Sequence, residues 1–532
     1  MKRSGCLILA LAAVSLTLAF SRDTYPRVTD LDAIHYRISL EIKDTGDEIA
    51  GETEILFAFN ADSVKSIPLD FAGLMADSVS ENSRAAQFEQ SAGKLNIRLQ
   101  GDYVRGNQTS IAVKYHGNPS DGLFFKKSKF GDRTVFADNW PNRAHFWFPS
   151  IDHPYDKASV DFFITAPARY GVIANGTPVE TTSTSSGAKL THWSEKVPIP
   201  TYCMVFGATN FSVVDAGSWN SIPLSYYLYP KDREHGIKDF GRALKMIEFY
   251  SGLIGPYPYE KLALVQSTTR FGGMENSSAI FFNERIFSGS GRLEPTVAHE
   301  IAHQWFGDSV TEADWHHVWL SESFATYFGA VFFERVDGRE LFMKMMQDYK
   351  TTYLKQYARD PRPMYDPEIT DPFRLLNANN YQKGAWVLHM LRRLMGDEQF
   401  FAGIRDYYGA FRDRNALTQD FQKVMELRAG RPLDWFFHEW FNEPGYPIYD
   451  VRWHWDAGQK ELRLHVMQKQ ANTLFVMPLD VEIRSSVAPR REIADVRERE
   501  QLFTFKLDQK PRSVVIDPDE WVLKVTTVKE EK

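Results

Sequence analysis

The sequence PTVAHEIAHQWFG, residues 295–307, holds two histidines four positions apart and a glutamate beside the first of them. Its proline suits the first turn of a helix and its glycine suits the end, so we predict a helix over 296–306. Residues four apart share one face of a helix, so His299 and His303 can bind one metal ion. Glu300 lies about 100° around the helix from His299, close enough to reach a water on that ion without binding the metal. A buried amphipathic helix with two hydrogen-bonded histidines is the alternative.

Catalytic zinc takes three protein ligands and keeps a fourth position open for water, so the histidine pair needs one more ligand. Glu322 is our candidate, because it is a single carboxylate in an otherwise apolar, helix-forming run, where its burial without a cation would be costly. We predict a second helix over 322–335 with Ser321 as its N-cap. His316 and His317 are competing ligands, but two adjacent loop histidines rarely face one ion.

The segments on either side predict β structure. Residues 22–215 contain runs of β-branched and aromatic residues separated by turn dipeptides, which indicates an antiparallel β domain. In residues 216–445 a few strand-like runs give way to long helical patterns, which indicates an α/β domain with a helical half. Strands return in residues 446–532, where we expect a small β-sandwich.

The N-terminus has the layout of a secretory signal peptide. Two basic residues precede an apolar run over 6–20, and small residues suit a cleavage before Arg22. The run is short for a membrane span. We therefore expect residues 1–21 to be removed, the protein to be periplasmic or extracellular, and no stable membrane insertion after cleavage. A retained anchor is the alternative. Cleavage would leave Cys203 as the last cysteine, so no disulfide is expected.

Composition restricts the class of protein. Of the 532 residues 43% are hydrophobic and 25% are charged, a balance that excludes a disordered, collagen-like or coiled-coil protein. The net charge of -7 argues against nucleic acid as a partner. The basic pair Arg490 and Arg491 stands among acidic residues, so we expect it on a solvated face.

Three motifs in order resemble the M1 family of zinc metallo-aminopeptidases. HEIAH at 299–303, followed after eighteen residues by Glu322, is similar to the family's zinc signature. GGMEN at 272–276 resembles its Gly-x-Met-Glu-Asn exopeptidase motif, and YQKGA at 381–385 resembles the segment whose tyrosine stabilises the transition state. The resemblance implies a multidomain β and α/β fold. Its parts are an antiparallel β-saddle N-terminal domain, a thermolysin-like α/β catalytic domain with a helical half, and a small C-terminal β-sandwich. The long helical C-terminal domain of larger members has no counterpart in this sequence, which implies a short form.

The resemblance also implies the catalytic roles. One zinc ion per chain, bound by His299, His303 and Glu322, would polarise the scissile carbonyl and activate water. Glu300 would act as the general base for that water and deliver the proton to the leaving amine. The hydroxyl of Tyr381 would donate a hydrogen bond to the developing oxyanion.

Substrate recognition is expected from the exopeptidase motif, which consists of Gly272, Gly273, Met274, Glu275 and Asn276. A buried N-terminal ammonium requires an opposed carboxylate, and Glu275 is the candidate. The glycine pair lets the backbone approach a substrate that adds along the following strand. Asn276 also begins a glycosylation sequon, which we expect to be unused because a glycan there would block the motif.

A second amine anchor is expected in the N-terminal domain, where the family often has a Gln or Glu. When Arg143 and the aromatic-Pro segment after it are aligned with the family pattern, Asp138 falls at the position of that Gln or Glu. A plain aspartate at the end of a strand is the alternative.

The sequence thus predicts an exported zinc aminopeptidase acting on peptides with a free N-terminal amine. Three rivals remain: a family member that mainly hydrolyses epoxides, a thermolysin-type endopeptidase, and a non-catalytic peptide-binding protein on the same scaffold. The missing helical domain weakens the first, Glu275 argues against the second, and the complete ligand set with Glu300 argues against the third. The preferred N-terminal residue and the oligomeric state do not follow from the sequence.

Overall fold

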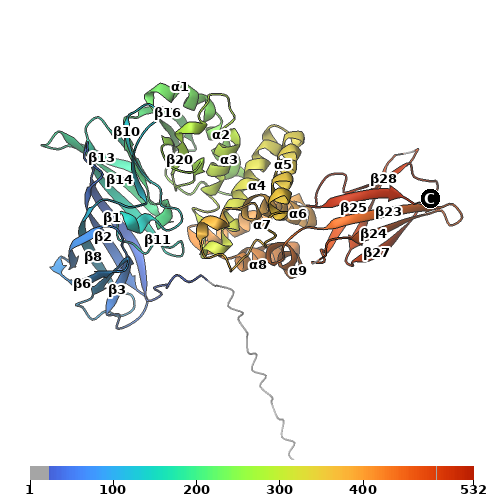
Figure 1. Cartoon of the computed structure of the whole chain (residues 1–532), viewed down its shortest axis with the longest axis horizontal. Coiled ribbons are helices and arrows are strands. Elements are labelled where there is room, and N and C mark those ends of the chain that lie inside the picture. Colours follow the sequence, from blue (N-terminus) through green and yellow to red (C-terminus); the bar gives the residue numbers. More distant parts are fainter. Residues whose placement is uncertain (1–22, 472, 487, 532) are drawn as a thin grey trace, which may run out of the picture.

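Several long strands in the N-terminal part alternate between core and solvent, as their period-two pattern predicts. In β11 (Lys157–Pro167), for example, every second residue is buried. This computed structural model describes residues 23–471, 473–486 and 488–531, so the predicted signal peptide, residues 1–21, lies outside the described residues. Figure 1 shows three parts in series: a β-rich N-terminal part, a largely helical centre and a second β-rich part at the C-terminal end.

An eight-stranded sheet is the frame of the N-terminal domain. In spatial order its strands are β13 (Thr177–Ser183), β14 (Ala188–Pro200), β11, β1 (Leu31–Glu41), β2 (Ile49–Phe59), β8 (Gln108–Gly117), β4 (Met75–Glu81) and β5 (Arg84–Ala85). Its pairs are antiparallel except for β1 and β11, which run parallel with Tyr36 opposite Val160. The sequence did not predict this exception, because a parallel pair is joined by a long connection rather than by a recognisable turn.

Two smaller sheets complete this domain. One consists of β12 (Gly171–Ala174), β15 (Phe206–Thr209), β10 (Arg133–Ala137) and β9 (Leu123–Lys127), and the other of β3 (Ser66–Asp70), β7 (Lys94–Arg98) and β6 (Gln87–Ser91).

A five-stranded mixed sheet opens the central domain. Its order is β16 (Ser212–Trp219), β17 (Ile222–Leu228), β18 (Leu262–Ser267), β20 (Ala279–Asn283) and β19 (Gly273–Met274). β16 pairs with β17 from Ser212 onward, so this domain's first strand begins before the predicted boundary at 215/216. The edge strand β19 is formed by two residues of the exopeptidase motif and runs antiparallel to β20.

Helices form the rest of the central domain. They are α1 (Arg233–Asp239), α2 (Ala243–Leu253), α3 (Glu294–His303), α4 (Trp319–Val336), α5 (Arg339–Tyr357), α6 (Gly384–Met395), α7 (Asp397–Phe411), α8 (Thr418–Ala429) and α9 (Asp434–Phe437). A short parallel pair, β21 (Val310–Glu312) and β22 (Arg414–Ala416), lies among them. Within residues 23–471, 473–486 and 488–531, no helix has the length and hydrophobicity needed to cross a membrane.

The two helices predicted around the metal motif exist, with shifted ends. α3 covers Glu294–His303, with its proline in the first turn as expected. α4 begins at Trp319 rather than at Glu322, so Ser321 lies inside the helix and the prediction that it is the N-cap was wrong. A short 3-10 turn over Trp315–His317 leads almost directly into α4, and Asp314 caps that turn by accepting a hydrogen bond from the amide of His316.

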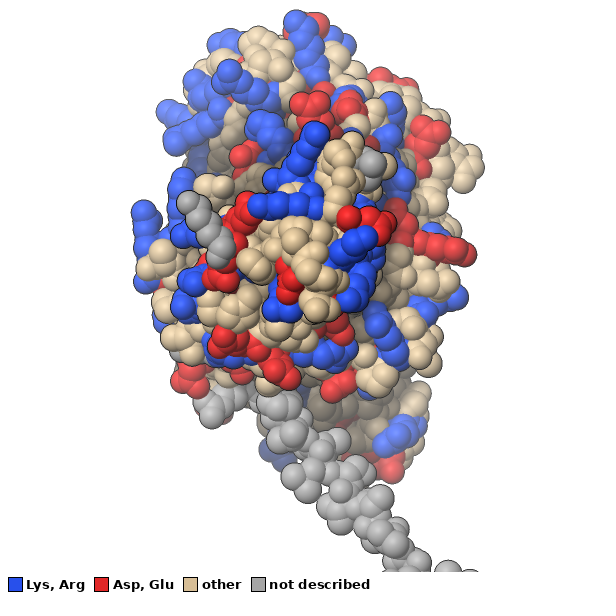
Figure 2. Space-filling model, turned by 90° about the vertical axis from the view of Figure 1, so that its right-hand side faces the viewer, with Lys and Arg blue, Asp and Glu red and all other residues tan. Residues whose placement is uncertain are grey.

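The C-terminal domain pairs two sheets, as predicted for a small β-sandwich. One sheet has β27 (Glu500–Lys506), β24 (Glu461–Gln468), β23 (Ile448–Asp456) and β29 (Val525–Glu530), and the other has β26 (Arg490–Val496), β25 (Met477–Arg484) and β28 (Ser513–Ile516). Figure 2 looks onto this end of the molecule, where basic and acidic side chains are interspersed. Arg490 pairs with Glu492 and Arg491 pairs with Asp519, which confirms the expected solvated face.

Candidate metal centre and substrate cavity

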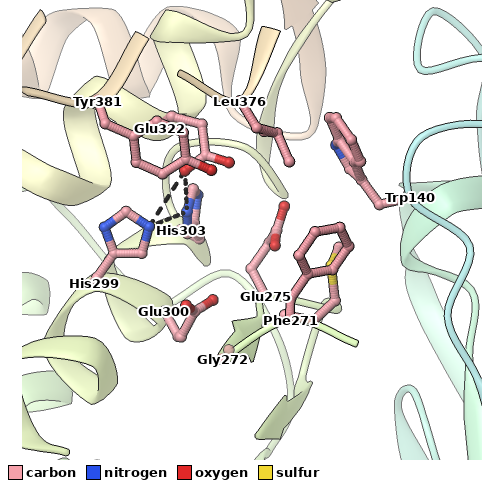
Figure 3. A pocket seen from close by; sticks show the side chains of 12 residues that line it. Trp140, Phe271, Gly272, Glu275, His299, Glu300, His303, Glu322, Leu376 and Tyr381 are labelled. Carbon is pink, nitrogen blue, oxygen red and sulfur yellow. Dashed lines mark hydrogen bonds and ion pairs between the residues drawn. The ribbon is translucent and has the colours of Figure 1, made fainter. Parts of the chain in front are cut away.

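Helix α3 presents two histidine rings to the first turn of α4. The Nε2 atoms of His299 and His303 lie 3.0 Å apart. Each of them is 3.3 Å from Oε2 of Glu322. In Figure 3 the three side chains point toward one another, with dashed lines between them. The structure therefore brings together the three residues predicted as metal ligands.

The spacing of these three atoms fits a zinc ion. Zinc–ligand bonds of about 2.0–2.1 Å in a tetrahedral site place neighbouring ligand atoms about 3.3 Å apart. Oε2 of Glu322 is buried and receives no well-formed hydrogen bond from any described residue. Burial raises the pKa of this carboxyl group, but the nearby rings of His303 and His299 outweigh burial and lower it. A buried, ionised oxygen of this kind requires a cation, and the two imidazole nitrogens complete the donor set that zinc prefers.

The second nitrogen of each ring is held by the protein. Nδ1 of His303 lies 3.0 Å from the carbonyl oxygen of Phe306 and 3.0 Å from Oγ of Ser321. A carbonyl can only accept, so Nδ1 carries the proton and the Nε2 lone pair is free for a metal. Oγ1 of Thr326 lies 3.4 Å from Nδ1 of His299. Sequence reasoning did not give Ser321 or Thr326 this role, because it depends on how α4 packs against α3.

The competing histidines are engaged elsewhere. His316 has Nδ1 2.9 Å from Oδ1 of Asp314 and Nε2 2.9 Å from the carbonyl oxygen of Ile369. Nδ1 of His317 lies 2.7 Å from Oγ1 of Thr418. Neither ring belongs to the group of side chains that could share an ion with His299 and His303.

A cavity opens beside the metal centre (Figure 3). It is lined by the three ligands, Glu300, Tyr381 and residues 272–275 of the exopeptidase motif. Residues from the zinc signature, from the exopeptidase motif and from the predicted tyrosine segment thus meet in one place. The cavity is also lined by Trp140, Phe271 and Leu376, which sequence reasoning did not select.

Two buried acids, Glu275 and Glu300, line this cavity, with a carboxylate oxygen of each within 4.8 Å of the other and of a ring nitrogen of His303. Burial raises the pKa of Glu275 to about 7, with His303 opposing the rise and Glu322 adding to it. Burial also raises the pKa of Glu300 well above its ordinary value. A Cβ atom on Gly273 would lie 2.2 Å from Oε1 of Glu300, so the glycine leaves the space that this carboxylate occupies. Acids with pKa values displaced in this way are typical of catalytic and binding groups.

Tyr381 reaches the cavity from a short π-helical turn, Asn379–Lys383, that leads into α6. Its ring is stacked 5.9 Å from the ring of His299. Burial raises the pKa of its hydroxyl, and the charge of Glu322 adds to the rise. The group therefore stays protonated and able to donate a hydrogen bond beside the metal centre.

The end of the exopeptidase motif turns into the protein rather than into the cavity. Asn276 is fully buried, and neither polar atom of its side chain has a hydrogen-bond partner among the described residues. A side chain with no exposed surface cannot carry a glycan in the folded protein, which agrees with the expectation that this sequon is unused.

Asp138 is not brought into the cavity. Its side chain is 1% exposed, and Oδ1 accepts a hydrogen bond from Nη2 of Arg143 at 2.6 Å. It lines a separate polar hollow together with Arg143 and Arg270. The structure thus gives this carboxylate an arginine partner, which fits the alternative of a structural aspartate, and its role as a second amine anchor stays a prediction.

Three side chains form an apolar wall at the Glu275 end of the cavity (Figure 3). The ring of Trp140 packs edge-on against Phe271, with the ring centroids 6.1 Å apart. It also packs against Phe373 at 5.4 Å and Trp315 at 5.3 Å. Trp140 lies two residues after Asp138, so the register that selected Asp138 could have pointed to it. Nothing in the sequence marks Leu376.

Two models of known protein families match this chain. The Peptidase M1 N-terminal domain model matches residues 32–203, and the Peptidase family M1 domain model matches residues 239–440. Tricorn protease-interacting factor F2 of Thermoplasma acidophilum is 29% identical over 73% of this chain and 50% of its own length. Probable aminopeptidase 2 of Sulfurisphaera tokodaii is 27% identical over 82% of this chain and 56% of its own. Glutamyl aminopeptidase of Rattus norvegicus is 28% identical over 62% of this chain and 36% of its own.

The chain therefore spans about half the length, or less, of these relatives. A crystal structure of an M1 zinc metallopeptidase from Deinococcus radiodurans has the same fold, with a TM-score of 0.68 and 23% sequence identity over 79% of this chain and 95% of that one. The two family models together cover most of the described residues and contain the three candidate metal ligands. The chain belongs to peptidase family M1.

Proposed function

We propose that this protein is a zinc-dependent aminopeptidase that removes the N-terminal residue from peptides with a free amine. The position of Glu275 carries the proposal. Its carboxylate lies in the same cavity as the three metal ligands, is 6% exposed, and receives no hydrogen bond from another described residue. A buried carboxylate is stabilised by a paired cation. The α-ammonium of a peptide whose first carbonyl lies at the metal centre is such a cation.

The chain's own groups supply the remaining chemistry. Zinc held by His299, His303 and Glu322 would supply Lewis-acid polarisation of the scissile carbonyl and a nucleophilic water at neutral pH. Glu300 takes the proton of the attacking water and delivers it to the leaving amine, a role that its raised pKa suits. Tyr381 donates a hydrogen bond from its hydroxyl to the oxygen on which negative charge develops.

We further propose that the first residue of the substrate is apolar. Trp140, Phe271 and Leu376 face the substrate at the Glu275 end, and burial against such a wall contributes about 1.5–3 kcal/mol for a Leu, Met or Phe side chain. No lysine or arginine lines the described cavity, so an acidic first residue finds no partner there. The name of glutamyl aminopeptidase gives that relative an acidic preference, and this wall supports a different one.

A panel of aminoacyl p-nitroanilides tests both parts of the proposal. We expect Leu, Met and Phe substrates to exceed the Glu and Lys substrates in kcat/KM by about tenfold or more. All activity should be lost with a chelator and restored by zinc. Equal rates on the Glu and Leu substrates would contradict the apolar preference, and no hydrolysis of any member by zinc-loaded protein would contradict the proposed function.

The rival functions make different predictions. A thermolysin-type endopeptidase would cleave internal bonds of blocked peptides, and a non-catalytic binding protein would bind peptides without cleaving them. A member that mainly hydrolyses epoxides would prefer an epoxide to every anilide. The unpartnered Glu275 beside a complete set of metal ligands favours the exopeptidase over each of them.

We also propose that the protein is exported, on the basis of the N-terminal sequence alone. The apolar run over 6–20 and the small residues before Arg22 support cleavage at that point. Sequencing the N-terminus of the protein recovered from the periplasm or the medium tests this. A first residue of Arg22 is expected, and full-length protein in the cytoplasm would contradict it.

A further inference from the structure

Gln304 follows the second zinc histidine directly and is fully buried. Its side-chain amide reaches from the end of α3 to the exopeptidase motif. Nε2 donates to the backbone carbonyl of Glu275 at 2.7 Å and to Oδ2 of Asp308 at 2.7 Å. Oε1 accepts from the backbone amide of Ser278 at 2.8 Å. One side chain thus holds both ends of the loop 275–278.

The hydrogen-bond partners of Gln304 identify which atom of its side-chain amide is the nitrogen and which is the oxygen. A carbonyl and a carboxylate need a donor, and a backbone N–H needs an acceptor. Only an amide side chain offers two donors and an acceptor from one planar group. A buried amide whose hydrogen bonds are all made is rigid, because breaking any of them leaves an unpaired polar group in the core.

The hydrogen bond from Gln304 to the backbone carbonyl of Glu275 matters for the position of the Glu275 side chain. No other described residue donates a hydrogen bond to its carboxylate, so the position of that carboxylate is set by its backbone. Other bonds to the loop act further along it, on residues 276–278: the carbonyl of Asn276, for example, accepts from the amide of Ala279 at 2.9 Å. Nδ2 of Asn175 donates to the carbonyl of Ser277 at 2.6 Å, and Oγ of Ser278 donates to Oε2 of Glu195 at 3.0 Å. Among these bonds, the one from Gln304 is made to Glu275 itself.

We propose that Gln304 is a positioning residue that fixes the substrate-amine anchor Glu275 relative to the metal centre. Because Gln304 is covalently next to His303, the distance between a metal ligand and the amine anchor is set across one peptide bond and one side chain. A misplacement of about 1 Å is enough to weaken catalysis strongly. The inference rests on the proposed aminopeptidase function, since it concerns how that function's amine anchor is held.

Two inhibitors that differ only in the amine isolate this role. Leucine hydroxamate carries the α-ammonium, and 4-methylpentanohydroxamate lacks it, while both bind zinc through the same group. The Ki of the amine-free inhibitor divided by the Ki of leucine hydroxamate, on zinc-loaded protein, measures amine recognition without catalysis. In Gln304→Met we expect this ratio to fall by about tenfold or more, with the Ki of the amine-free inhibitor changed by less than about threefold.

Gln266→Met is the matched control. Gln266 is also a fully buried glutamine of the central domain, and its amide accepts from the backbone of Tyr229 at 2.9 Å and donates to Asp232 at 2.5 Å. None of these three residues lines the cavity. The Gln266→Met substitution should therefore leave the Ki ratio unchanged. If Gln304→Met does not fold, Gln304→Glu keeps the shape and the acceptor for Ser278, and the same fall in the ratio is expected.

A double-mutant cycle completes the test. In Glu275→Ala the amine advantage is already lost, so adding Gln304→Met should not lower the ratio further. An unchanged ratio in zinc-loaded Gln304→Met, or equal weakening of both inhibitors, would overturn the positioning role. If the unmodified protein bound both inhibitors equally, the aminopeptidase proposal itself would fail, and that result differs from every other outcome.

Discussion

Replacing Glu275 with glutamine removes one charge from the cavity while keeping the size of the side chain. An ammonium about 4 Å from the carboxylate, at an effective dielectric constant of about 20, is attracted by about 4 kcal/mol. That energy corresponds to about three orders of magnitude in kcat/KM. The glutamine can still accept a hydrogen bond from the ammonium, so we expect kcat/KM for leucine p-nitroanilide to fall by about two to three orders of magnitude.

The assay compares zinc content and steady-state kinetics of the two proteins. Zinc should remain near one per chain in Glu275→Gln, because the substitution leaves the ligand set intact. Glu81→Gln is the matched control: Glu81 is buried in β4 of the N-terminal domain, where Oε2 accepts from the amide of Gln100 at 2.7 Å. A decrease below fivefold in zinc-loaded Glu275→Gln would refute the assignment of Glu275 as the amine anchor.

Three further predictions concern the metal, the base and the pH dependence of stability. Glu322→Ala should lose most of its zinc, measured by elemental analysis, while His316→Ala keeps it; the reverse pattern would show that the third ligand is misassigned. Glu300→Gln should keep its zinc and lose about two orders of magnitude or more in kcat, and near-normal kcat would rule out the general-base role. Burial raises the pKa of Glu439 to about 8, although its carboxylate accepts a hydrogen bond from the amide of Val476 at 2.8 Å. The folded state therefore holds a proton that the unfolded chain releases above about pH 4.3, so this group's contribution to stability is full below that pH and is lost as the pH rises through about 8. Glu439→Gln should raise Tm at pH 9 and leave it unchanged at pH 4, and equal Tm values at pH 9 would contradict this.

The three candidate metal ligands could be selected from the sequence because their chemistry is local. His299 and His303 share a helix face through their spacing, and Glu322 stood out as a lone carboxylate in an apolar run. The structure adds what fixes them, namely the carbonyl of Phe306 on one ring and Thr326 near the other. These contacts depend on the packing of α4 against α3, which a spacing rule does not contain.

The wall of the cavity was not predictable, because it is assembled from distant parts of the chain. Trp140 comes from the N-terminal domain and Leu376 from a loop before α6, and their proximity exists only after the domains pack. The same packing pairs Asp138 with Arg143. In the N-terminal sheet, the parallel pair of β1 and β11 escaped prediction because pairing partners far apart in the chain leave no turn signature.

The most direct test is hydrolysis of a matched pair of peptides, one with a free N-terminus and one N-acetylated, with and without a chelator. A zinc aminopeptidase with Glu275 as its amine anchor removes residues one at a time from the N-terminus, and only from the free peptide. Its activity disappears with the chelator and returns with zinc. Equal cleavage of both peptides, cleavage at internal bonds, or unchanged activity in the chelator would contradict this function.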